Sequence, residues 1–175
     1  MFSEGESEVS TITNDEIGSR FPVKYVANCF LQRDFEDGHP TISPMKIQKL
    51  VYCLHGWHLA ITDQPAIDGV FEAWPYGPVE EELYHIFKTY RNAPITDYAK
   101  SWSADEQKPF VVSNTNNKFY EILDYVARKY MPFSALQLSA LTHQPNTPWS
   151  ITRNEGSDII SDDLIKNHFR GLVDQ

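Results

Sequence analysis

Apolar side chains recur at helical spacing in several stretches of the chain, which proline, glycine and polar residues separate. After Pro22, apolar residues occupy the i, i+3, i+4, i+7 and i+8 positions of one face, which predicts a helix that ends before Gly38. Ser43 and Pro44 suit the N-cap and the first position of a second helix, which continues to Ala60. Beyond its first turns this segment is apolar on nearly every face, so we expect other elements to surround it.

Gly56 stands inside the predicted second helix. Glycine costs about 1 kcal/mol relative to alanine in a helix interior. We therefore expect a neighbouring backbone or aromatic ring to pack closely against this position.

Shorter elements are predicted around a proline-rich stretch in the middle of the chain. Residues 70–74 have strand character, which indicates a short hairpin or an extended cross-brace. A third helix is expected to turn Val79 inward and to carry glutamates 80–82 in its first turn, where the helix dipole favours anions. Residues 92–117 are polar and broken by proline, and they indicate a long connection with a brief strand at residues 110–112.

Helical periodicity returns in the last third of the chain. Apolar residues repeat at helical spacing over residues 119–130, and Ser134 with Gln137 forms a capping-box pattern. Further helix starts are indicated at residues 147–149 and 161–163. The whole pattern predicts a mainly α fold: a compact helical bundle around a central buried helix, with one or two short β-strands or an extended hairpin.

Length and composition indicate one domain preceded by a tail. The chain has 175 residues, and domains commonly contain about 100–200. Residues 3–19 are rich in Ser, Glu, Asp, Thr and Gly, so they bury too little apolar surface to offset the entropy of ordering. We expect residues 1–20 to form a flexible acidic tail and residues 21–175 to form a single domain.

The charge balance favours a basic protein partner over nucleic acid. Acidic residues outnumber basic residues by 24 to 15, a formal net charge of −9, which repels phosphate backbones. Two cysteines do not make a disulfide framework, and apolar runs fall short of the roughly 18–20 residues that span a bilayer. The N-terminus is acidic where a signal peptide is basic. We expect a cytoplasmic protein without a membrane partner.

Histidines and cysteines in the second helix raise the question of a metal site. His55 and His58 are three residues apart near Cys53, and Cys29 lies in the first helix, so a zinc site is conceivable. The chain has no CxxC, no HExxH and no second paired-ligand motif. We therefore expect buried or hydrogen-bonded histidines, with no metal and no cofactor.

His143 is the one candidate for a catalytic base. Glu155 or Asp158 could orient it, but no nucleophile stands in a recognisable motif and no Gly-rich phosphate loop is present. The alternative is that His143 caps a helix end or anchors a loop. We expect a protein that is not an enzyme.

The stretch of residues 74–79 combines two aromatic rings and two prolines around Gly77, which predicts a rigid bend. The bend can serve as a buried elbow that pins the strand against the central helix. It can also form the wall of a recognition groove, since aromatic anchors supply much of the energy of binding. Both roles are compatible.

Several ordered motifs resemble one known family. They cover residues 44–52 (PMKIQKLVY), 56–60 (GWHLA), 72–79 (EAWPYGPV), 83–84 (LY), 138–143 (LSALTH) and 148–149 (PW). In this order they resemble the Panacea domain, also called the SocA-like antitoxin or phage-associated GepA-type domain, from about Phe21 to about Glu155.

This resemblance implies a mainly helical domain found in bacteria and prophages, which often acts as the antitoxin of a toxin–antitoxin pair. Members neutralise a toxin by direct protein contact, and the acidic charge leads us to expect a basic toxin. The alternative is a proteolytic adaptor that delivers its toxin or client to a ClpXP-type protease. The residues expected to bind the partner, or to form the motif that does, are Lys46, Gln48, Lys49, Tyr52, Trp57, Trp74, Tyr76, Gly77, Pro78, Val79, His143 and Trp149.

Overall fold

The computed structural model describes residues 8–12 and 20–173, which are mainly helical and include two small sheets. The helices are α2 (Val23–Glu36), α3 (Pro44–Thr62), α4 (Glu81–Phe87), the 3-10 turn η1 (Lys88–Tyr90), α5 (Asn117–Tyr130), α6 (Ala135–Thr142), α7 (Pro148–Asn154) and α8 (Asp162–Val173). The strands are β1 (Ser10–Ile12), β2 (Phe71–Trp74), β3 (Gly77–Glu80), β4 (Lys100–Ser103), β5 (Glu106–Val112) and β6 (Ile159–Ile160). None of the described helices is both long enough and apolar enough to cross a membrane.

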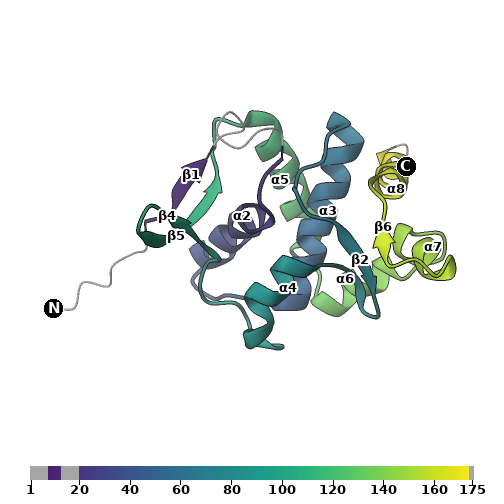
Figure 1. Ribbon diagram of the computed structural model, residues 1–175, viewed down its shortest axis with the longest axis horizontal. Helices are drawn as coiled ribbons and strands as arrows, with labels where there is room; N and C mark the ends of the chain where they lie inside the picture. Colours follow the sequence, from purple (N-terminus) through teal and green to yellow (C-terminus); the bar gives the residue numbers. More distant parts are fainter. Residues whose placement is uncertain (1–7, 13–19, 174–175) are drawn as a thin grey trace.

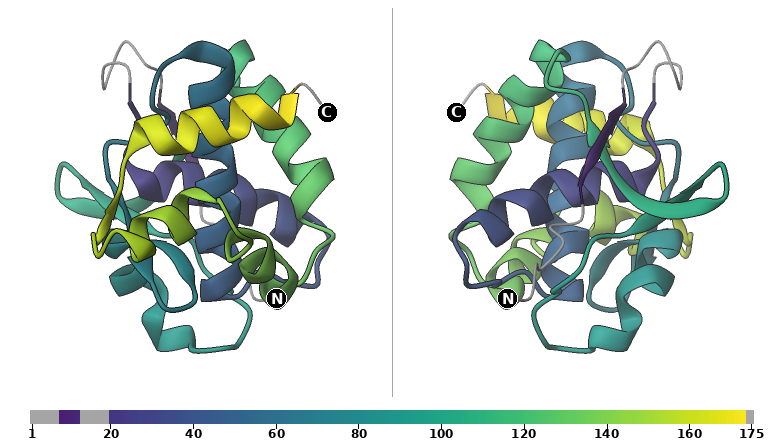
Figure 2. Two further views of the ribbon diagram at one scale, coloured as in Figure 1. Left: turned by 90° about the vertical axis from the view of Figure 1, so that its right-hand side faces the viewer. Right: turned by 90° about the vertical axis from the view of Figure 1, so that its left-hand side faces the viewer.

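Helix α3 runs through the middle of the molecule (Figure 1), and its residues 46–57 are all buried. Helices α2, α4, α5, α6 and α8 and strand β3 pack against it. Seen from two opposite sides in Figure 2, α8 crosses α3 on one side, whereas α2 and β1 lie on the other. The apolar side chains on nearly every face of α3 account for this central position.

Local capping groups set the helix starts. The Ser43 side chain accepts a hydrogen bond from the Lys46 backbone at the start of α3. Ser134 and Gln137 form both hydrogen bonds of a capping box at α6, and Thr147 caps α7. The helix starts predicted at these positions are confirmed.

Two three-stranded sheets flank the helices. In one, β2 pairs antiparallel with both β3 and β6. In the other, β5 pairs in parallel with β1 and antiparallel with β4, and β5 packs against α2. The buried Asn28 side chain joins α2 to the sheet that contains β4 and β5. It donates to Ala99 O and Phe110 O and accepts from Ala99 N.

The structure corrects several sequence expectations. Residues 10–12, expected within a flexible tail, form strand β1, while residues 1–7 and 13–19 lie outside the described part of the chain. Val79 lies in β3 rather than in the third helix, which begins at Glu81 with Glu80 as N-cap. The expected long connection contains the whole β4–β5 hairpin, so the sheets exceed one or two strands or a single hairpin.

Candidate partner-binding site

The β2–β3 hairpin turns sharply between Trp74 and Gly77, and we call residues 73–80 the bend. Gly77 has a φ of +107°, in the region that favours glycine. A β-carbon there would stand 2.6 Å from Thr142 Oγ1 and 2.8 Å from Lys49 Cε. Glycine is therefore required both by the backbone conformation and by the close approach of α3 and α6.

The backbone of the bend is held by side chains from α3, α6 and α7 and by His143, the residue that follows α6. Five of its carbonyl oxygens each accept a hydrogen bond from a different side chain, and a sixth, Pro75 O, lies within hydrogen-bond distance of the His143 ring. The pairs are Arg153 with Ala73 O (3.0 Å), Trp149 with Trp74 O (2.7 Å), His143 with Pro75 O (2.9 Å), Ser139 with Tyr76 O (2.9 Å), Lys49 with Pro78 O (3.0 Å) and Gln48 with Glu80 O (2.9 Å). Because each partner lies far away in sequence, the bend is fixed by the tertiary structure and not by local turn chemistry alone.

Two neighbouring residues of α3 anchor strand β3. The Gln48 amide donates to Glu80 O and accepts from Glu80 N, both at 2.9 Å. Lys49 is only 1% exposed, and burial lowers its pKa from 10.5 to about 8. No described carboxylate forms an ion pair with its ammonium, which donates to Pro78 O. The hydrogen bond from Lys49 to the bend therefore requires a buried ammonium without an opposite charge, which costs electrostatic free energy.

His143 ends α6 and reaches across to the bend. Its Nδ1 lies 2.6 Å from Ser139 O and its Nε2 lies 2.9 Å from Pro75 O, while its ring stands 3.9 Å from the Trp149 ring. A neutral imidazole can donate to only one of these carbonyls, whereas an imidazolium donates to both. The polar partners of His143 are thus backbone oxygens and the Thr142 hydroxyl, rather than the carboxylates once considered for a catalytic pair.

Aromatic and aliphatic side chains remain exposed around this fixed backbone. Tyr76 at the tip is 69% exposed, and Trp74 packs its ring 4.9 Å from that of Tyr84. Leu136 of α6, which is 73% exposed, lies one helical turn before Ser139, whose hydroxyl donates to Tyr76 O. We call Trp74, Tyr76, Tyr84 and Leu136 the bend surface. Trp74, Tyr76 and Tyr84 also line a pocket of about 260 Å³ that α3 closes from behind.

The structure brings most of the predicted binding residues together, but many of them are buried. Lys46, Gln48, Lys49, Tyr52, Trp57, Gly77, Pro78 and Val79 are buried. Packing and internal hydrogen bonds hold these residues in this conformation, so they support the site from within. Their part in binding a partner stays a prediction. Tyr76 is exposed, and Trp74, His143 and Trp149 are partly exposed.

Sequence reasoning missed four residues of the site. Ser139 lies within the recognised residues 138–143, so the motif carried a signal for it. Arg153, Tyr84 and Leu136 stand out only once α4, α6 and α7 are seen beside the bend.

The histidines considered as metal ligands have protein partners. His55 Nδ1 accepts from the Ala66 backbone, so its Nε2 carries the proton that faces Asp162 Oδ1 at 2.8 Å. His58 Nδ1 lies 2.7 Å from Gln64 O. Within residues 8–12 and 20–173, no group of three or more His, Cys, Asp or Glu is placed to hold a metal ion.

The chain is similar to one protein family and to one characterised relative. The family model described as "Antitoxin SocA-like, Panacea domain" matches residues 47–150. Antitoxin SocA of Caulobacter vibrioides (strain NA1000 / CB15N) is 31% identical over 152 residues, which cover 83% of this chain and 80% of that relative. No solved structure gives a significant match. The matched region contains the bend and all of its side-chain donors except Arg153.

Proposed function

Because this chain belongs to the antitoxin SocA-like, Panacea-domain family, we propose that it is an antitoxin that neutralises a partner toxin by direct contact. The bend surface makes that contact. The role is one of binding, and no catalytic step is assigned to the chain.

The observation that carries this proposal is the rigid presentation of the bend surface. Five carbonyls of the bend accept hydrogen bonds from side chains of the body, and Pro75 O lies 2.9 Å from His143 Nε2, while Tyr76 at the tip remains exposed. Interfaces gain affinity when the contact groups are already ordered before binding, since little conformational entropy is then lost. Tyrosine and tryptophan are also the side chains that most often dominate binding energy.

Acidic residues beside the bend support a basic toxin. A hollow of about 440 Å³ is lined by Asp68, Glu72, Glu80, Glu81 and Glu82. Glu72 accepts a hydrogen bond from the indole of Trp74, which joins the hollow to the bend surface. Opposite charge on a partner would speed association and favour the correct partner over others.

Co-expression with the product of the adjacent reading frame tests the proposal, with bacterial growth and co-purification scored together. The wild-type chain should restore growth and form a stable complex. Tyr76→Ala should weaken the complex about tenfold or more. The matched control is Trp102→Ala, because Trp102 on β4 is 70% exposed and lies outside the bend surface. Equal affinities of the two variants for the toxin would contradict the bend surface, and absence of a complex would contradict the antitoxin role.

The same cells test the protease-adaptor alternative, which no observation on the described residues favours. Neutralisation by contact predicts that the half-life of the toxin is unchanged or longer when this chain is present. A shorter half-life that depends on the protease would instead show that the chain delivers the toxin for degradation, and would contradict direct neutralisation.

A further inference from the structure

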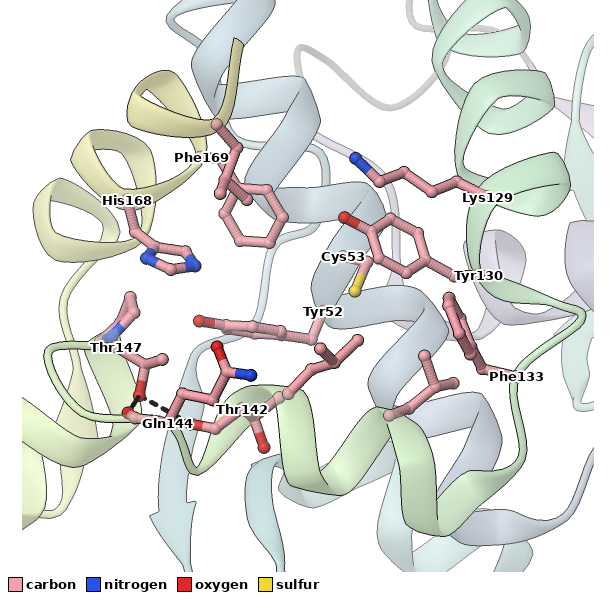
Figure 3. Close-up of a pocket in the computed structure, with 14 residues that line it drawn as sticks. Tyr52, Cys53, Lys129, Tyr130, Phe133, Thr142, Gln144, Thr147, His168 and Phe169 are labelled. Carbon is pink, nitrogen blue, oxygen red and sulfur yellow. Dashed lines mark hydrogen bonds between the residues drawn. The ribbon is translucent and has the colours of Figure 1, made fainter. Parts of the chain in front are cut away.

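A separate pocket of about 290 Å³ lies beside α6, framed by α5, α6, α7 and α8, with Tyr52 and Cys53 of α3 at its base (Figure 3). Its walls are largely apolar and include Phe133, Leu138 and Phe169. Most small-molecule sites have this composition, with a few polar groups that fix the orientation of the ligand. The polar groups of this pocket therefore indicate what it would bind.

Tyr52 places an unpaired hydroxyl in the pocket. The residue is 3% exposed, and its ring lies across the pocket with the hydroxyl pointing toward His168 (Figure 3). The hydroxyl forms no hydrogen bond to any described residue, and burial raises its pKa well above 10. The residue lines the pocket and its hydroxyl points into it, so the hydroxyl is free to pair with an oxygen of a bound molecule.

Lys129 and Tyr130 supply donors at another edge of the pocket. The Lys129 ammonium donates to the Tyr125 hydroxyl and stands 5.1 Å from the centre of the Trp57 ring. The Tyr130 hydroxyl accepts from Trp57 Nε1 at 3.1 Å, which leaves its own proton without a described acceptor. Lys129 and Tyr130 both line the pocket, and both contact the Trp57 side chain.

The lining carries positive charge and no carboxylate. Lys129 makes no ion pair with a described acidic residue, and no Asp or Glu lines the pocket. Burial lowers the pKa of His168, so that ring adds little positive charge near neutral pH. The electrostatic complement of the pocket is therefore a single anionic group attached to an apolar body.

We propose that this pocket binds a small aromatic carboxylic acid that carries an oxygen opposite its carboxylate. The carboxylate lies against the Lys129 ammonium and the Tyr130 hydroxyl. The aromatic ring packs between the apolar walls, and the opposite oxygen pairs with the Tyr52 hydroxyl. This site is independent of the proposed contact of the bend surface with a toxin.

Isothermal titration calorimetry on the full chain tests the proposal with p-hydroxyphenylpropanoate, its neutral amide and unsubstituted phenylpropanoate. The acid should bind severalfold more tightly than the amide, because only the acid pairs with the exposed ammonium of Lys129. The para oxygen should add severalfold affinity over phenylpropanoate. No binding at millimolar concentration, or equal binding of acid and amide, would overturn the proposal.

Two variants assign the two ends of the ligand. Lys129→Gln should remove the preference for the acid over the amide, whereas Lys118→Gln, on the same helix but outside the lining, should keep it. Tyr52→Phe should remove the advantage of the para oxygen and leave the preference for the acid. Thermal melting of each variant establishes that it is folded. A Lys129→Gln protein that still prefers the acid would overturn the assigned orientation and, with it, the proposed ligand class.

Discussion

Phe169 of α8 packs its ring directly onto Gly56 of α3: a β-carbon at position 56 would stand 2.2 Å from Cε2 of that ring. The sequence predicts a neighbouring backbone or aromatic ring packed closely against this glycine, and the close packing is confirmed, with a ring as the neighbour. The contact lets α8 approach the central helix closely, and α8 in turn forms one wall of the pocket beside α6.

Gly56→Ala should destabilise the protein by about 1–3 kcal/mol, because the overpacking against Phe169 exceeds the gain of about 1 kcal/mol in helix propensity. Urea denaturation measures the change. Gly171→Ala in α8 is the matched control, since nothing lies within 4 Å of its added β-carbon. It should leave stability unchanged or raise it slightly, and a gain in both variants would contradict the packing argument.

Gly77→Ala should cost about 3 kcal/mol or more, because a positive φ and two close contacts act together. Gly38→Ala separates these terms, since Gly38 has a φ of +71° with nothing within 4 Å of its added β-carbon. That control should lose only about 1 kcal/mol. Urea denaturation measures both free energies of unfolding. Equal losses would show that α3 and α6 move enough to accommodate the added β-carbon of Gly77→Ala.

The sequence predicts the helices well, because their signals are local. Ser43, Ser134 and Thr147 each bind a backbone N–H three residues away, so the chain itself carries their partners. Strand β1 could not be predicted in this way. Ser10 pairs with Phe110 far along the chain, and the polar sequence around it indicates a tail until β5 is in place.

The same distinction between local and distant contacts applies to the candidate site. Two rings and two prolines around Gly77 predict a rigid bend from its own residues. The hydrogen bonds that fix it join Lys49 to Pro78 and Arg153 to Ala73, and such pairs depend on how α3 and α7 pack. The sequence motifs contain buried residues that hold the bend, such as Lys49, as well as the exposed Tyr76. Which of them is exposed depends on the same packing, so the motifs alone did not separate them.

Tyr130→Phe and Tyr52→Phe should differ in stability, although each removes one hydroxyl from a buried tyrosine. The first removes the acceptor of the Trp57 indole N–H and should cost about 1–3 kcal/mol. The second removes a hydroxyl without a described partner and should be neutral or slightly stabilising. Urea denaturation of the ligand-free variants measures both values, and an equal loss would mean that the Tyr52 hydroxyl has a partner after all.

Lys49→Met should reveal the electrostatic cost of the buried ammonium through its pH dependence. Burial lowers the pKa of Lys49 from 10.5 to about 8 in the folded state. Between these two values the unfolded chain binds more protons than the folded chain, so this group makes the wild-type protein more stable as pH rises. A shift of this size corresponds to about 3 kcal/mol at most.

The measured quantity is the free energy of unfolding of the wild-type protein minus that of Lys49→Met, at neutral pH and again near pH 10. Burial raises the pKa of Cys29 and Cys53 to about 11 and about 12, which lowers stability at high pH in both proteins. The Lys49 charge lowers the pKa of Cys53, so its removal raises that pKa further and acts in the same direction as the loss of the ammonium. The difference should therefore move in favour of the wild type as pH rises, because only the wild type has an ammonium to lose. A difference that does not change with pH would mean that Lys49 keeps its ordinary pKa, with its charge stabilised by groups other than Pro78 O.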